Sequence, residues 1–185
     1  MWRHIGRVWT NGEQFLVMDR YFLYAWQGEQ DQVDALADLH WSETATEVGT
    51  GMAAVVAVDG AVKQEGWLEV FKNRKTIAIV QALGEPYSRA LGKALEYPAD
   101  GDHVGDIVPV PSGDMYFFSS VLGGDGDWPK AKPGKAPASW EPATNAPSGL
   151  RFDVPRGDYV LQVRWMTEPD EETCFARWLF TPIFT

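Results

Sequence analysis

The sequence predicts an α+β fold dominated by antiparallel β-sheet, with about two short helices. Apolar runs of about five to eight residues recur along the chain and are separated by turn-forming residues, a pattern typical of strands. Only two segments have the apolar spacing of a helix. Apolar residues make up 45% and aromatic residues 13% of the 185 residues, which is ample material for a packed core. The length fits a single domain over residues 1–185, or two β-rich halves (1–110 and 111–185) that share one core.

The N-terminal third begins with two predicted strands, at residues 14–18 and 21–26. The intervening Asp19-Arg20 pair is short enough for a tight hairpin turn. A second hairpin is predicted for residues 52–64, because Asp59-Gly60 supplies the positive φ angles of a type I′ turn. A third pairs residues 67–71 with 76–82.

Two segments are predicted to be helical. In residues 29–41, Val33, Leu36, Ala37 and His40 follow the i, i+3, i+4, i+7 spacing of an apolar face, and the acidic residues point the other way. Residues 85–96 begin with Glu85-Pro86, and proline suits the first turn of a helix.

The C-terminal half continues the strand pattern. Strands are predicted at residues 114–121 and 173–180, and a further hairpin pairs 150–154 with 159–166. Between them, residues 123–149 contain five prolines and five glycines without periodicity. A long segment of this kind is functional or mobile, and we expect an irregular surface loop anchored by Trp128 or Trp140.

Charge restricts the function classes. The chain carries 26 acidic and 16 basic residues, a formal charge of −10, which disfavours binding to nucleic acid and to anionic membranes. Residues 21–62 and 94–129 contain no Lys or Arg, and each run holds seven acidic residues. Such a one-sign surface either steers a partner of opposite charge or keeps the protein soluble; both interpretations stay open.

Catalytic and cofactor motifs are not found in the sequence. It contains no nucleophile elbow, phosphate-binding loop or dinucleotide fingerprint. His4, His40 and His103 are far apart in the sequence and form no zinc pattern, and Cys174 lacks the flanking residues of a nucleophile. We therefore expect no enzyme activity, no cofactor and no metal. The N-terminal residues do not resemble a signal peptide, and one cysteine suits a cytoplasmic location.

Several segments resemble the bacterial immunity proteins of the Imm21 type, which protect cells against polymorphic toxins. The resemblance extends over most of the chain and rests on residues 9–12, 15–18, 26–28, the helix with Asp31, Asp34 and Ala35, and residues 53–58, 67–69, 113–120, 157–159 and 168–173.

The resemblance implies a cytoplasmic, non-enzymatic protein that binds and neutralises a cognate toxin domain. From the acidic runs and the tryptophans outside predicted strands, the candidate contact residues are Asp31, Asp34, Asp38, Trp128 and Trp140. A β-domain that binds a small molecule or a carbohydrate is the alternative, since exposed tryptophans also stack on sugar rings.

Overall fold

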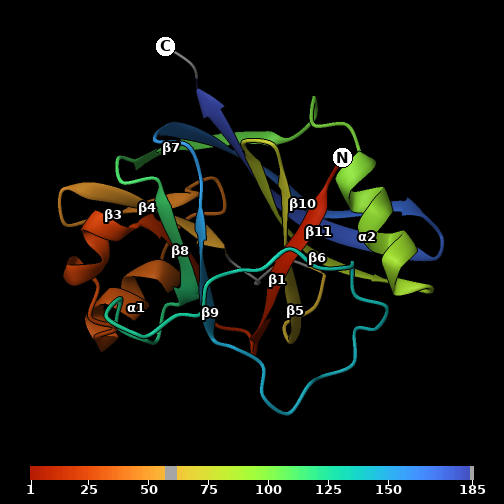
Figure 1. Ribbon diagram of the computed structural model, residues 1–185, viewed down its shortest axis with the longest axis horizontal. Helices are drawn as coiled ribbons and strands as arrows, with labels where there is room; N and C mark the ends of the chain where they lie inside the picture. Colours follow the sequence, from red (N-terminus) through yellow and green to blue (C-terminus); the bar gives the residue numbers. More distant parts are fainter. Residues whose placement is uncertain (57–61, 184–185) are drawn as a thin grey trace.

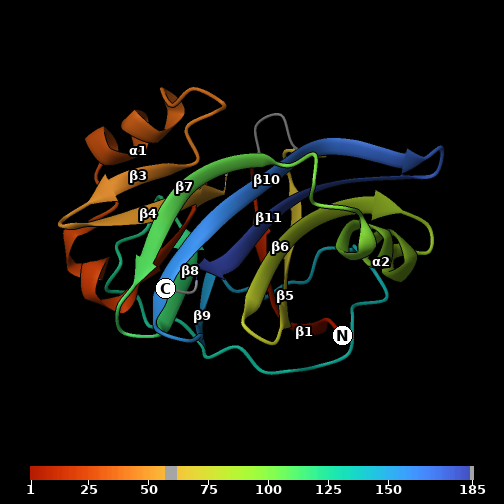
Figure 2. The same cartoon turned by 90° about the horizontal axis from the view of Figure 1, so that it is seen from above.

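The computed structural model describes residues 1–56 and 62–183, and confirms the predicted α+β class. Two antiparallel sheets pack face to face, with helices on both outer faces (Figures 1 and 2). The first sheet has the strand order β1 (Arg3–Thr10), β5 (Gly66–Asn73), β6 (Thr76–Gly84), β11 (Thr173–Ile183), β10 (Gly157–Asp170), β7 (His103–Val110). The second has the order β3 (Ala45–Val48), β4 (Gly51–Val56), β2 (Phe15–Asp19), β8 (Asp114–Ser119), β9 (Gly149–Asp153). Each sheet takes strands from both sides of residue 110.

The main core lies between the two sheets. In β2, Phe15 and Val17 point into this core, whereas Leu16 and Met18 point to the opposite face. All four side chains are buried, because a helical layer covers that second face. A strand buried on both faces has a continuous apolar sequence, which is why residues 14–18 could be predicted.

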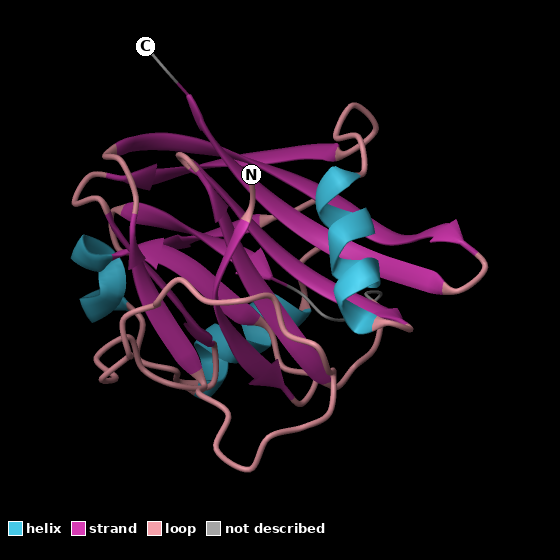
Figure 3. Ribbon diagram, turned by 45° about the vertical axis from the view of Figure 1, so that its right-hand side comes forward, coloured by secondary structure: helices cyan, strands magenta, loops and turns pink. Residues whose placement is uncertain are grey.

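Helix α2 (Tyr87–Glu96) covers the outer face of the six-stranded sheet (Figure 3). Its buried side chains are Tyr87, Ala90, Leu91 and Ala94. They pack on Phe71, Ala78, Val80 and Phe175. The predicted helix at 85–96 is therefore confirmed, with its apolar stripe facing the sheet.

The outer face of the five-stranded sheet is covered by a 3-10 helix, η1 (Arg20–Ala25), and by α1 (Gln30–Ala37). Phe22, Trp26 and Leu36 are buried against this sheet. The Trp26 indole N–H donates to the Ser120 carbonyl at 3.0 Å. Helix α1 is shorter than the predicted 29–41, so His40 lies beyond its end and is exposed.

The predicted strand at residues 21–26 is wrong, and so is the hairpin at Asp19-Arg20. The buried Asp19 carboxylate accepts a hydrogen bond from the Tyr21 N–H at 2.8 Å and caps η1. Its other oxygen accepts from the Ser112 hydroxyl at 2.7 Å. With the chain turned into a helix, Phe22 and Trp26 reach the core while Tyr24 points to solvent, a spacing that does not fit a strand.

The predicted hairpin between 150–154 and 159–166 is also wrong. β9 pairs with β8 in one sheet, whereas β10 lies between β11 and β7 in the other. The connection changes sheets at Pro155 and Gly157, which has a φ of 142°. The Tyr159 hydroxyl donates to the Pro155 carbonyl at 2.8 Å and fixes the crossover.

The pairing of residues 67–71 with 76–82 is confirmed by the β5–β6 hairpin. Asn73 pairs with Thr76, so Arg74 and Lys75 form its two-residue turn. Arg74 has a φ of 55°. The predicted turn at Asp59-Gly60 lies outside the described residues, but the predicted hairpin is wrong. β4 pairs with β3 and β2, and residues 62–64 are not in a strand.

The Gly/Pro-rich segment between β8 and β9 closes one open side of the sandwich. The Ala131 N–H donates to the Arg151 carbonyl of β9 at 2.7 Å, and the Lys132 N–H donates to the Ile5 carbonyl of β1 at 3.0 Å. In Figure 1 this segment runs as a teal loop along the lower side of the molecule. The segment has no predicted strand, yet residues 130–134 supply hydrogen bonds to both sheet edges.

Candidate functional site

The two segments that lack basic residues lie side by side in the fold. Thr44 donates its hydroxyl proton to Asp106 at 3.0 Å, which joins the first segment to β7. The Gly124 N–H donates to the Trp26 carbonyl at 2.8 Å, which joins the second segment to the end of η1. The end of the molecule formed by η1, α1 and β3, on the left of Figure 1, therefore carries acidic residues of the first segment together with Asp106 of the second, whereas Asp102 lies at the end of α2.

The close approach at β7 depends on a glycine. A Cβ atom at Gly105 would lie 2.1 Å from the Thr44 hydroxyl oxygen, closer than any non-bonded contact allows. Only glycine at position 105 lets Thr44 come this close to Asp106. The Thr44 hydroxyl then donates to the Asp106 carboxylate and accepts from the Asp106 backbone N–H.

Helix α1 carries the three aspartates predicted as contact residues. A capping box between Glu29 and Gln32 begins the helix. Buried Leu36 holds one face against the sheet, so Asp31, Asp34 and Asp38 are exposed. The structure thus brings the three carboxylates together on one short helix.

Of these charges, Asp31 lies in the first turn, where a negative charge favours the helix, and Asp34 accepts a hydrogen bond from Gln30 at 2.6 Å. Asp38 alone opposes the helix dipole. It is the C-cap, where the dipole favours a positive charge, and the last turn contains no basic residue. Like charges three or four positions apart, such as Asp31 and Asp34, also repel each other. Residues that break a local rule without a structural benefit are commonly found where a protein binds something.

Exposed aromatic side chains lie beside the acidic helix. Tyr24 is 66% exposed, Trp41 is 61% exposed and Tyr21 is 53% exposed. Trp41 stands between the rings of His40 and His103, with centroids 5.4 Å from each. Large rings in contact with water beside charged groups are the usual anchors of protein interfaces. We call these three aromatics, together with Asp31, Asp34, Asp38, Glu43 and Glu47, the acidic–aromatic face. Exposed Arg20, whose guanidinium lies 5.4 Å from the Tyr21 ring, borders it.

The three exposed aromatics of this face were not predicted from the sequence as contact residues. Tyr21 and Tyr24 fall in the run predicted to be a strand, and Trp41 falls in the predicted helix, where half of the side chains are expected to be buried. Their position in the sequence could have indicated them, because all three lie within the first segment that lacks basic residues.

The two tryptophans predicted as contact residues lie elsewhere. Trp128 is half-buried and stacks on Phe118, with ring centroids 5.5 Å apart and planes inclined by 14°, in the core cluster beneath α1. Trp140 is 37% exposed. Its indole N–H donates to Glu85 at 3.3 Å, and Lys63 lies 4.9 Å from its ring, so Trp140 belongs to the side of the molecule that carries α2.

A buried carboxylate, Glu69, organises a second polar cluster. It accepts hydrogen bonds from Arg7 Nε at 3.0 Å and from the Tyr87 hydroxyl at 2.8 Å, and it pairs with His4 Nε2 at 2.8 Å. Burial, and then the nearby Glu69 charge, raise the pKa of the Tyr87 hydroxyl. The neighbouring hollow beneath Trp140 has a free volume of about 10 Å³, room for about one water molecule. The cluster fastens β1, β5 and α2 together and leaves no space for a substrate.

A third charged cluster fixes the end of α2. The Asp102 carboxylate pairs with Arg164 at 2.6 Å and with Arg177 at 2.8 Å. Arg177 also donates to the carbonyls of Ala94 and Tyr97, each at 2.7 Å. Its terminal nitrogens are therefore occupied by the helix end and by Asp102, which is a structural task, while its Nε is buried without a partner.

No group of three or more His, Cys, Asp or Glu side chains within residues 1–56 and 62–183 is arranged to hold a metal ion. In the same ranges, no helix has the length and apolar character to cross a membrane. Burial raises the pKa of the Cys174 thiol, which makes it a poor nucleophile.

Comparison of the chain with protein-family models, with curated proteins and with solved structures finds no match.

Proposed function

We propose that this protein binds a basic partner protein through its acidic–aromatic face, and that this partner is a toxin which the protein neutralises. The observation that carries the proposal is that exposed Trp41 and Tyr24 lie on the segments that flank α1, whose exposed carboxylates include Asp38, a charge that opposes the helix dipole. The resemblance to immunity proteins supplies the class of partner.

The two kinds of side chain have different tasks in such an interface. Carboxylates without basic neighbours attract a positively charged surface over several ångströms and raise the rate of encounter. Exposed aromatic rings then provide contact area and slow dissociation. A toxin that handles a polyanionic substrate carries a basic groove, so an acidic inhibitor matches it in charge.

The first test is protection of cells. The chain is co-expressed with the toxin encoded beside it, and survival is compared with an empty vector. Equal survival would contradict the assignment as an immunity protein. If the chain formed a complex with the toxin but gave no protection, it would be a toxin-binding protein that does not neutralise.

The second test locates the surface by biosensor kinetics with that toxin. In the triple variant Asp31→Asn/Asp34→Asn/Asp38→Asn, the association rate at low salt is expected to fall about tenfold and to depend less on salt. A matched control, Glu65→Gln/Asp158→Asn/Glu171→Gln, removes three exposed acids elsewhere and should associate normally. Equal rates in the two triple variants would rule out the α1 face.

The aromatic part is tested by Trp41→Ala. An interface anchor costs at least about 2 kcal/mol when truncated, so Kd should rise about 30-fold through faster dissociation. Trp140→Ala is the control at a distant tryptophan, and a larger effect there would move the interface to the α2 side.

A further inference from the structure

A cationic groove lies away from the acidic–aromatic face, at the tip of the β5–β6 hairpin. It consists of three hollows with volumes of about 520, 510 and 230 Å³. The first two share Met1, Asn73 and Arg74, and the last two share Ile5, Lys72 and Pro133. The three hollows are therefore adjacent, and together they are called the channel.

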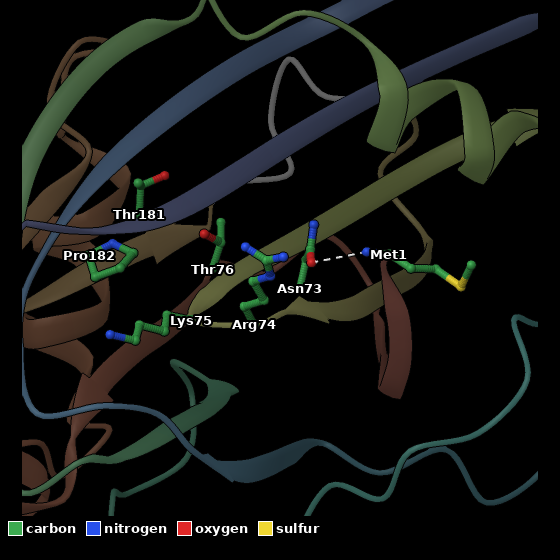
Figure 4. Close-up of a pocket in the computed structure, with 7 residues that line it drawn as sticks. All are labelled: Met1, Asn73, Arg74, Lys75, Thr76, Thr181 and Pro182. Atoms are coloured by element: carbon green, nitrogen blue, oxygen red, sulfur yellow. Dashed lines mark hydrogen bonds between the residues drawn. The ribbon is translucent and has the colours of Figure 1, made fainter.

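The channel connects five parts of the chain. It begins between the hairpin turn and the end of β11, where Arg74, Lys75, Thr181 and Pro182 line it (Figure 4). It then passes Arg3 of β1 and ends between residues 130–133 and β9.

The groove gathers positive charge on a protein whose net charge is −10. The basic side chains that line it are Arg3, Lys72, Arg74, Lys75 and Lys130. Among the described lining residues the single carboxylate is Asp153, which Lys130 already neutralises at 2.6 Å. Within the described chain, neither Arg3 nor Arg74 makes an ion pair. The groove thus holds guanidinium groups that are free to meet an anion.

Arg74 occupies a backbone conformation that favours glycine. Its φ of 55° at the first turn position is strained for a residue with a Cβ atom. The two-residue turn requires a positive φ at this position, and the sequence places arginine there instead of the glycine or asparagine that adopts it readily. This choice places a long cation at the junction of two hollows.

We propose that the groove binds an acidic, extended segment of a partner protein. Its cations are distributed along a channel instead of converging on one point, which fits a chain of carboxylates. Apolar groups lie among the charges: Ile5, Ala131, Pro133 and Pro182 also line the channel. An acidic segment with interspersed apolar side chains matches both features.

The same features disfavour other anions. Binding to single-stranded nucleic acid relies on exposed aromatic rings for base stacking, and the aromatic lining residue of the described channel, Phe152, is only 3% exposed. A compact phosphate group prefers several donors that converge on it.

Fluorescence anisotropy tests the proposal with a labelled peptide rich in Asp and Glu with interspersed Leu and Pro. The comparison probes are the same peptide with Gln in place of its acids, a labelled oligothymidylate and, by competition, tripolyphosphate. We expect the acidic peptide to bind and its affinity to fall as salt rises. Absence of binding, or tighter binding of any comparison probe, would overturn the proposal.

Variants then locate the site. Because an exposed ion pair is worth up to about fivefold in affinity, Arg3→Gln/Arg74→Gln should weaken peptide binding about tenfold. Arg89→Gln removes an exposed cation on α2 and should leave binding unchanged. Equal affinity in the double variant and the control would contradict the assignment.

Arg74→Gly separates binding from folding. Glycine relieves the positive φ, so the melting temperature should rise while peptide affinity falls. A fall in both would show that Arg74 supports the hairpin and would overturn its role in binding. None of these measurements involves α1, so their outcome is independent of toxin binding.

Discussion

Glu69 holds its negative charge where its side chain has no exposed surface, and its neighbours compensate it from three directions. Arg7 also stacks over the Trp67 ring at 3.8 Å and donates to the Ser139 carbonyl at 3.0 Å. Glu69 therefore orients Arg7, which in turn holds β1 and the long loop between β8 and β9 in place.

Replacing this carboxylate by an amide should be costly. Glu69→Gln keeps the shape but leaves Arg7 without its counter-charge. We expect the free energy of unfolding to fall by about 2 to 4 kcal/mol, somewhat below the full cost of breaking a buried pair because Arg7 remains 25% exposed. Urea denaturation measures this, with exposed Glu65→Gln as the control. A loss below about 1 kcal/mol would mean that the pair is weak.

Buried tyrosines should make the protein sensitive to alkali. Burial raises the pKa of Tyr159 to about 12, and Tyr87 is shifted in the same direction, whereas both ionise near 10 when unfolded. The stabilisation is complete below pH 10 and is lost as pH rises toward 12 and beyond, by about 2 to 3 kcal/mol for Tyr159.

Urea unfolding between about pH 9 and pH 11.5 tests this expectation. Tyr159→Phe loses the hydrogen bond to Pro155, which costs about 1 kcal/mol at neutral pH, but its stability should fall less steeply with pH. Tyr24→Phe is the exposed control and should keep the steep slope. Identical slopes in all three proteins would contradict the role of Tyr159.

At the scale of elements, α2 contains a position that can be improved. Gly92 lies within the helix, and an added Cβ atom would have no neighbour within 4 Å. Because glycine lowers helix stability relative to alanine, Gly92→Ala should raise the free energy of unfolding by about 0.5 to 1 kcal/mol. Thermal denaturation measures the gain. A matched change in the same helix, Leu91→Ala, should cost about 2 to 4 kcal/mol because Leu91 is buried.

Elements with strong local signals could be predicted from the sequence. β2, β5, β6 and β8 are buried apolar runs, and α2 has a full apolar stripe. Three strands were missed because their sequences are polar or contain glycine and proline. β1 contains His4 and Arg7, β3 has four residues, and β7 contains Gly105 and Pro109. All three lie at the edges of their sheets, where one side of the strand has no ladder to maintain and polar residues are tolerated.

The wrong predictions concern segments whose structure is decided by contacts with distant parts of the chain. Residues 21–26 became a helix because Asp19 is held by Ser112, which is 93 residues away in the sequence. Likewise, nothing local shows that β9 and β10 enter different sheets. For the candidate site, the aspartates on α1 could be predicted from helical spacing, whereas the exposure of Trp41 depends on where α1 ends.

At the scale of the whole molecule, the two halves of the sequence are interleaved. β7 joins the six-stranded sheet through β10, and β11 lies between β6 and β10. β2 similarly lies between β4 and β8. A core built in this way requires strands from beyond residue 110 in both of its layers.

A fragment of residues 1–110 should therefore not fold. Without β8 to β11, the inward faces of β2 and β6 would lose the layers that bury them. We expect the fragment to show no cooperative thermal transition by circular dichroism, while the full chain shows one that coincides with its tryptophan fluorescence change. A cooperative transition in the fragment would establish an independent N-terminal domain.

The hydrogen bonds from residues 130–134 to β1 and β9 also bear on how the protein avoids polymerising. A strand edge with unpaired backbone groups is a template to which a foreign strand can add, and here the chain occupies two such edges with its own Gly/Pro-rich segment. Prolines in that segment cannot extend the ladder further. Residues 130–134 thus end both sheets on this side of the molecule. A variant that lacks them would expose the unpaired edges of β1 and β9 together and should form fibres.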